Sequence, residues 1–159
     1  MGQLLAKRDL EILSLLEKDA RAPWRRIARE LGVSESTIYM RVKKLQEEGV
    51  LEGFTVKLNR KKLGLDVVLF ILIRAEAGKI KTLREELRKI PYLCEAHQIT
   101  GEYHFLVKIT APNREAAGRV LDEIAALPGV QDIRILFSLH ELVDGSNIAS
   151  MLLEWAGKG

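Results

Sequence analysis

The chain has a single cysteine and no long hydrophobic run, and each scarcity excludes a class of protein. Cys94 is the only cysteine among the 159 residues, so no disulfide can form within the chain, as is typical of proteins in a reducing cytoplasm. No apolar stretch approaches the roughly 20 residues that span a bilayer, and the N-terminus lacks the hydrophobic segment of a secretory signal. We therefore expect a cytoplasmic protein with no membrane partner.

Motifs of catalysis and of metal binding are also missing. The sequence has no nucleophile–base arrangement, no glycine-rich phosphate loop and no recognisable pair of catalytic carboxylates. Cys94 and His97 are close in sequence, but residues an odd number apart on a strand face opposite sides, and no CxxC or HxxxH spacing supports a tetrahedral site. We expect no catalytic residue, no metal site and no cofactor.

Charge is unevenly divided between the two halves of the chain. Residues 1–64 contain 14 Lys and Arg against 9 Asp and Glu, a net charge of +5, whereas residues 65–159 contain 11 against 13, a net charge of −2. The N-terminal half is therefore the one expected to meet nucleic acid. The 47% hydrophobic and 30% charged residues indicate one or two small folded domains, and the abundance of Lys, Arg and Glu favours a thermophilic source.

Residues 23–48 have the pattern of two short amphipathic helices separated by a glycine turn. The first begins at Pro23, ends before Gly32 and repeats apolar residues at i, i+3, i+4 and i+7. Ser34 is placed to cap the second helix. The residues that should face inward are Trp24, Ile27, Ala28, Leu31, Ile38, Val42 and Leu45. This arrangement is typical of a helix-turn-helix, in which the second helix enters a DNA groove.

The polar side of the second helix supplies the candidate DNA contacts. Such a face can also be the solvated side of an ordinary helix, but its coincidence with a glycine turn and a capped helix favours DNA. We expect base contacts from Ser36, Tyr39, Met40 and Lys43, and phosphate contacts from Arg25, Arg26, Lys44, Lys57 and Arg60. Ser34 and Thr37 complete the set at the start of this helix. Arg41 either contacts DNA or pairs with an acid such as Glu48.

Two flanking segments complete this domain. Residues 7–18 predict a first helix whose leucines close a three-helix core. Apolar and polar residues alternate in residues 50–58 (VLEGFTVKL), which also contain a glycine, and this pattern suits a short β-wing. The polar, basic residues 59–64 read as a hinge.

The second half contains a repeated pattern of strand, helix and strand. Residues 69–73 and 105–109 are apolar strands, each followed by a helix that ends at a proline and by another strand, at 94–99 and 132–139. This order is β-α-β-β-α-β, the ferredoxin-like arrangement, with helices on only one face of the sheet. The strands have too many apolar positions for the other face to be open to water. Either the tail at 148–155 covers it, or a second copy does; we favour a homodimer, with the tail adding contacts.

Several short segments together resemble one known family. They are Asp19–Arg21, Ile27–Ser34 (IARELGVS), Thr37, Arg41–Leu45 (RVKKL), Glu48–Leu51, Gly53-Phe54, Leu63-Gly64 and Thr100–Tyr103 (TGEY). In this order and spacing, across nearly the whole chain, they resemble the Lrp/AsnC (feast/famine) transcription regulators. The resemblance implies binding of double-stranded DNA, a homodimer that assembles further, commonly into an octamer, and control by an amino acid or related small molecule.

The hairpin Thr100, Gly101, Glu102, Tyr103 and His104 is the candidate effector site. The pattern alone is that of a hairpin tip; the resemblance places an amino-acid effector there. Backbone N–H groups of such a turn can hold a carboxylate, and Glu102 can meet an α-ammonium. Many members have an acid where this chain has His104, which can change the effector, make binding pH-sensitive or abolish it.

The sequence therefore predicts an α+β fold. Residues 1–60 form a winged helix-turn-helix, residues 61–65 a hinge, and residues 66–159 a ferredoxin-like effector and assembly domain with a four-stranded antiparallel sheet. Two rival functions share this frame. Sirohaem decarboxylases are enzymes built on it, but their histidine-rich signature looks absent from residues 97–105 (HQITGEYHF). An architectural DNA-coating protein would show weak sequence preference and a long cooperative footprint.

Overall fold

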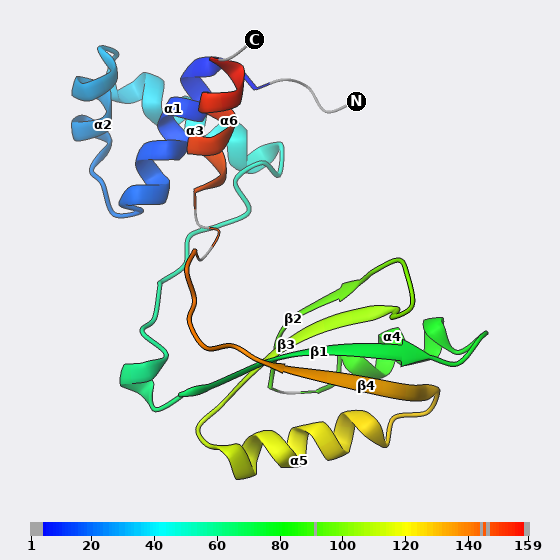
Figure 1. Ribbon diagram of the computed structural model, residues 1–159. Coiled ribbons are helices and arrows are strands. Elements are labelled where there is room, and N and C mark those ends of the chain that lie inside the picture. The colour runs from blue at the N-terminus through cyan, green and yellow to red at the C-terminus, as the bar shows by residue number, and fades with distance from the viewer. Residues whose placement is uncertain (1–4, 91, 144, 146, 158–159) are drawn as a thin grey trace. The chain divides into compact units, whose positions relative to one another are not determined.

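The computed structural model describes residues 5–90, 92–143, 145 and 147–157. It divides the chain into two compact units (Figure 1). One comprises residues 1–57 together with 143–159, and we call it the helical unit. The other comprises residues 58–142, and we call it the sheet unit. The described residues form no helix long and apolar enough to span a membrane.

The helical unit is built on three helices, α1 (Lys7–Lys18), α2 (Trp24–Leu31) and α3 (Glu35–Glu47). Their inward residues form one core, which includes Ile12, Leu16, Ile27, Ala28, Ile38 and Val42. Gly32 ends α2 with φ of 66°, a left-handed conformation that glycine adopts without steric cost. The predicted helix, turn and helix are therefore confirmed, with Gly32 at the turn.

The C-terminal helix α6 (Ile148–Ala156) belongs to this unit and packs on α1. Glu17 of α1 accepts a hydrogen bond from the backbone N–H of Ala149 over 2.9 Å, and the hydroxyls of Ser14 and Ser150 are 2.8 Å apart. A carboxylate at a helix N-terminus satisfies an N–H group that has no intrahelical partner. The structure thus differs from the expected assignment of residues 66–159 to the second domain, because α6 belongs to the helical unit and packs on α1.

The segment expected to form a β-wing has no regular structure. Residues 52–59 are assigned to neither helix nor strand, and the side chains of Val56 and Leu58 are well exposed. A strand needs a neighbour to satisfy its backbone groups, and alternation alone does not supply one. The hinge residues instead contain a short 3-10 helix, η1 (Lys61–Leu63).

The sheet unit has four strands in the order β2-β3-β1-β4, all antiparallel. They are β1 (Val67–Ala75), β2 (Leu93–Gln98), β3 (Phe105–Ala111) and β4 (Val130–Phe137). Helices α4 (Ile80–Leu87) and α5 (Arg114–Ala125) follow β1 and β3 in the chain and cover one face (Figure 1). This is the ferredoxin-like βαββαβ order that the repeat predicted.

The register decides which apolar residues the helices cover. Leu69, Ile71 and Ile73 of β1 are fully buried against the helices with Phe105 and Val107 of β3. The open face is made of the alternate positions, Val68, Phe70, Leu72, Arg74, Leu106, Lys108, Thr110, Arg134 and Leu136. Leu69, Ile71, Ile73, Phe105 and Val107 therefore belong to the helix-covered core, and the open face mixes apolar and charged side chains. We use the name open face for these nine residues below.

Candidate nucleic-acid interface and hairpin site

The start of α3 is set by Ser34. Its hydroxyl accepts a hydrogen bond from the Thr37 backbone N–H over 3.2 Å and lies 2.7 Å from the Thr37 hydroxyl and 2.9 Å from that of Ser36. An N-cap of this kind satisfies an N–H group at the helix end and fixes the direction in which the helix leaves the turn. Ser34, Ser36 and Thr37 are thus gathered at one end of α3, where Ser34 acts as the predicted cap.

The two sides of α3 differ sharply in burial. Ile38, Val42 and Leu45 are at most 3% exposed, whereas Tyr39 is 53% and Met40 is 61% exposed. Large apolar side chains that face water do not stabilise the fold of a small domain. The structure therefore leaves Tyr39 and Met40 available to a partner, next to the exposed Ser36 and Lys43.

Among the described residues, the ion pairs of the α3 lysines are made within α3 and with its C-cap residue. Lys43 lies 3.8 Å from Glu47, and Lys44 lies 3.6 Å from Glu48, each pair one helical turn apart and well exposed. Exposed pairs of this type contribute little to stability and are screened by salt. Both ammonium groups can therefore exchange a glutamate for a phosphate or a base at small cost.

The arginines of α2 occupy an exposed side of that helix. Arg26 donates to Asp19 over 2.7 Å. The backbone N–H of Arg21 and the Arg26 guanidinium together hold the pKa of Asp19 below its ordinary value. Arg25 is exposed and forms no ion pair among the described residues. Arg25 is thus the candidate phosphate contact on α2 that needs no rearrangement, while Arg26 must leave Asp19.

Two further expected DNA contacts pair with acids that are distant in the sequence. Arg41 donates to Asp9 of α1 over 2.8 Å, so it pairs with an acid, though not with Glu48. Arg60 donates to Glu141 over 2.5 Å within the sheet unit. Lys57 is exposed in the segment without regular structure. The candidates on α2 and α3 therefore belong to the helical unit, while Arg60 belongs to a network on the sheet.

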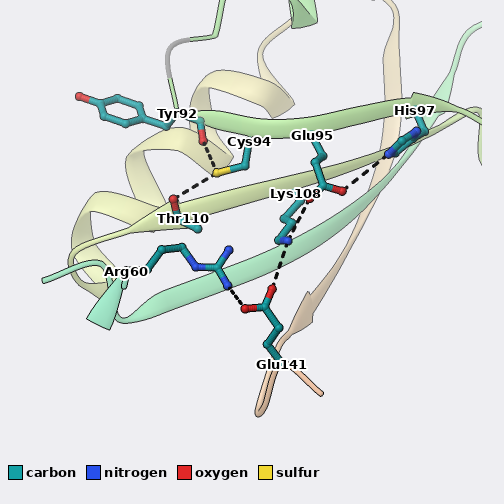
Figure 2. A network of polar contacts seen from close by, with 8 residues as sticks. All are labelled: Arg60, Tyr92, Cys94, Glu95, His97, Lys108, Thr110 and Glu141. Atoms are coloured by element: carbon teal, nitrogen blue, oxygen red, sulfur yellow. Dashed lines mark hydrogen bonds and ion pairs between the residues drawn. The ribbon is translucent and has the colours of Figure 1, made fainter. Parts of the chain in front are cut away.

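That network lies across the open face of the sheet (Figure 2). Lys108 is 3.0 Å from Glu95 and 3.6 Å from Glu141, and its ammonium lies 5.8 Å from the centre of the Phe70 ring. The Lys108 hydrogen bond lowers the pKa of Glu95, and the Arg60 hydrogen bond lowers the pKa of Glu141. Acids of the same chain therefore balance the charges of Lys108 and Arg60.

A β-bulge changes the expected placement of Cys94. The register of β2 shifts between Leu93 and Glu95, and the Cys94 sulfur lies 3.2 Å from the Thr110 hydroxyl of the open face. His97 pairs with Leu106 of the same face, so the simple alternation that separated Cys94 from His97 fails. Among the described residues there is still no group of three or more side chains able to hold a metal.

The hairpin between β2 and β3 is present where the sequence predicts it. The Ile99 N–H donates to the His104 carbonyl over 2.9 Å, and Gly101 has φ of 119°, a conformation that favours glycine. Thr100 and Glu102 are exposed, while Tyr103 is buried. His104 is a structural residue here: its Nδ1 accepts the Ala75 N–H of β1 over 3.0 Å.

Three residues that the sequence analysis missed surround this hairpin. The Tyr103 hydroxyl donates to Asp132 over 3.3 Å, and Arg134 lies over the Tyr103 ring at 5.5 Å. Arg74 lies 3.7 Å from Glu102 and 3.8 Å from Asp132, and its buried Nε has no hydrogen-bond partner among the described residues. Arg74 could have been identified from the sequence, because it is a charged residue on the otherwise apolar strand β1. Two acids and two arginines thus converge beside the hairpin.

Comparison with known proteins gives likenesses over both units. Residues 7–46 match the family model of the AsnC-type helix-turn-helix domain, and residues 68–148 match that of the Lrp/AsnC ligand binding domain. The HTH-type transcriptional regulator FL11 of Pyrococcus furiosus is 36% identical over 87% of this chain and 92% of its own length. The regulator of the same name from Pyrococcus abyssi is 39% identical, over 82% of this chain and 87% of its own.

Solved structures agree with the sequence matches. The AsnC of E. coli has a TM-score of 0.84 at 28% identity and covers 89% of this chain and 97% of its own. A transcriptional regulator of Neisseria meningitidis, solved as an L-Met complex, has a TM-score of 0.82 at 26% identity and covers 90% and 95%. The predicted fold, a helix-turn-helix followed by a ferredoxin-like domain, is therefore confirmed.

Proposed function

Because this chain belongs to the Lrp/AsnC family and is a transcriptional regulator with a helix-turn-helix DNA-binding domain and a ligand-binding domain, we propose that it binds a specific operator as a homodimer whose affinity an amino acid controls. The observation that carries the proposal is the division of α3. One side is sealed in the core, and the other exposes Tyr39, Met40 and Lys43.

The exposed side of α3 has the chemistry needed to read bases. Lys43 can donate to the O6 and N7 acceptors of guanine, and Met40 can pack on a thymine methyl. Arg25, Arg26 and Lys44 meet phosphates, which set register and affinity for every sequence alike. Arg41 serves instead to hold α3 on α1.

The open face of the sheet supports the homodimer. Its apolar members Phe70, Leu72 and Leu106 are only half-buried in one chain, and a second copy buries such a face on both partners at once. Lys108 is already neutralised by Glu95 and Glu141 of its own chain, so a dimer contact would not leave the Lys108 charge buried without a partner. A dimer presents two α3 helices to half-sites about 34–36 Å apart. Further assembly of such dimers, up to an octamer, extends the same proposal.

The cluster beside the hairpin supports amino-acid control. An amino acid carries one carboxylate and one ammonium group; Arg74 and Arg134 suit the first, and Glu102 and Asp132 suit the second. The Neisseria regulator was solved with L-Met, which makes an amino acid the first class to test here. Titrating the twenty amino acids into the protein by calorimetry tests this part, with Glu102→Gln as the disrupting variant and Glu123→Gln on α5 as its control. Absence of heat from all twenty, with folded protein, would reject it.

The test of DNA recognition begins with a footprint on the promoter of the protein's own gene, with and without an amino-acid mixture. Anisotropy titrations of the protected fragment then compare variants. Lys43→Ala should relax the base preference at one position by about 1–3 kcal/mol. Arg25→Ala should weaken binding to all sequences and lower the salt slope by about 0.9.

The matched control is Lys89→Ala, which removes an exposed lysine of the sheet unit that pairs with Glu86. It should leave operator binding unchanged. If Lys43→Ala and Arg25→Ala both bind like the unmodified protein, α3 is not the reading helix. A long cooperative footprint with little base preference would reject binding to a specific operator and would indicate an architectural DNA-coating protein.

A further inference from the structure

A pocket of about 350 Å³ lies between α4 and β2. The described residues that line it come from α4 and its C-cap, from β2 and from the start of β3, and they include none of the hairpin residues 100–104. Its volume falls near the lower end of the range for small-molecule sites. The pocket is therefore separate from the charged cluster of Arg74, Glu102 and Asp132.

The floor of this pocket is apolar. Leu87 of α4 and Phe105 of β3 line it, and each is 2% exposed. Ala96 lines it too, and its register partner Val107 belongs to the helix-covered face. A small side chain at position 96 leaves room above the core that a larger one would fill. The pocket thus offers a compact apolar surface to one end of a ligand.

The rim of the pocket is basic. Arg84 of α4 and Arg88, the C-cap residue of that helix, are one helical turn apart and both line the pocket. Arg84 donates to the Gln98 side chain over 2.6 Å and forms no ion pair among the described residues. Arg88 pairs with Glu85 at 3.3 Å, but both side chains are more than half exposed, so this contact is weak and replaceable. No acid lines the pocket among the described residues.

We propose that this pocket binds a small carboxylate with a compact apolar tail, as a ligand site separate from the hairpin. The carboxylate receives hydrogen bonds from the fork of Arg84, a geometry that suits a guanidinium better than an ammonium. The tail rests on Leu87 and Phe105. A free phosphate could bind the arginine but has no apolar part to contact Leu87 and Phe105. A neutral analogue could contact these two residues but would give Arg84 no anion to bind.

The position of the pocket gives its ligand a route to the hairpin. Gln98 is the last residue of β2, and the next residue, Ile99, donates its N–H to the His104 carbonyl. A ligand that draws Arg84 away from Gln98 therefore acts on the strand that leads into the hairpin. The binding site itself does not depend on what the hairpin binds, nor on DNA.

The test uses isocaproate as the probe, titrated into the full-length protein and followed by two-dimensional amide NMR. We expect saturable shifts at residues 84–88 and 96–98, with a dissociation constant on the order of 1 mM or tighter. Isocaproamide, which has the same shape without the charge, and inorganic phosphate should each bind at least tenfold more weakly. Equal binding of either analogue, no saturable shift, or shifts confined to residues 100–104 would overturn the proposal.

Two variants separate the charge from the floor. Arg84→Gln should raise the dissociation constant of isocaproate about tenfold, because a charged hydrogen bond is lost. Ala96→Phe should abolish binding by filling the pocket while leaving every charge in place. Arg119→Gln on α5 is the control, since Arg119 is exposed and pairs with Glu115 away from the pocket. If folded Arg84→Gln and Ala96→Phe proteins bind isocaproate as the control does, the site lies elsewhere.

Discussion

Arg41 of α3 donates a hydrogen bond to Asp9 of α1 across 2.8 Å, so the helix that carries the candidate base contacts is tied by its own arginine to the helix that supports it. The Asp9 side chain is 17% exposed and that of Arg41 is 39% exposed. Such a pair is only partly screened by water. Its role follows from this geometry: it fixes α3 in the helical unit instead of contacting DNA.

Replacing Arg41 should therefore cost stability and leave the salt dependence of DNA binding unchanged. Arg41→Gln should lower the free energy of unfolding by about 1 kcal/mol. Both tryptophans, Trp24 and Trp155, belong to the helical unit, so their fluorescence in a urea titration reports its unfolding. A cycle with Asp9→Asn should show coupling between the two changes. Additive losses, or a salt slope lowered by about 0.9 as for a phosphate contact, would contradict this assignment.

The local pattern of the sequence was enough to predict the helix-turn-helix and the order of the strands. The burial of Ile38 and Val42 opposite the exposed Met40 follows from the 3.6-residue period. The four strands follow from a repeat in which each helix ends near a proline. Both signals lie within a few residues of the element that they predict.

Contacts between distant residues were not predictable in the same way. Arg41 is 32 positions from Asp9, and Arg60 is 81 positions from Glu141; an arginine on a helix has many possible acids. The bulge at Cys94 reverses one face assignment without any glycine or proline to mark it. The exposed segment 52–59 has strand-like alternation, but among the described residues it pairs with no strand. The local pattern does not show whether such a partner exists or where in the sequence it lies.

Removing the carboxylate of Glu17 should release α6 from α1. Glu17 accepts hydrogen bonds from the backbone N–H groups of Ala149 and Ser150, at 2.9 and 3.4 Å. Glu17→Ala leaves these groups unsatisfied, and the loss of a helix cap costs about 1 kcal/mol. Hydrogen exchange of residues 149–156 should accelerate about fivefold, while exchange in α3 stays unchanged. The control is Glu11→Ala, which removes another acid of α1, one that pairs with Arg8 and not with α6. If hydrogen exchange in α6 is the same in Glu17→Ala as in the unmodified protein, the contact is refuted.

The hydrogen bond accepted by Nδ1 of His104 should contribute more to stability than the packing of the imidazole ring. Its Nδ1 accepts the N–H of Ala75, a residue that is 3% exposed. His104→Ala leaves that buried N–H without a partner and should cost about 1–3 kcal/mol. His104→Asn can present its side-chain oxygen at a similar position, so it should cost less. Thermal unfolding monitored by NMR of the β1 amides compares the two; equal losses would mean that packing of the ring, and not the hydrogen bond, stabilises the hairpin.

The network of Lys108 predicts how the sheet unit responds to acid. The Lys108 hydrogen bond lowers the pKa of Glu95 in the folded chain, so the unfolded chain binds a proton there more readily than the folded one. The resulting stabilisation is complete above the ordinary pKa of glutamate and is lost as the pH falls through the lowered value, in the range below about pH 4. Lys108→Met removes the hydrogen bond that lowers the pKa of Glu95. The loss of stability on acidification, measured by amide exchange in β3, should therefore be smaller in this variant. Arg60→Met should remove only the part due to Glu141, whose pKa Arg60 lowers. If Lys108→Met keeps the full acid dependence of the unmodified protein, the network does not set it.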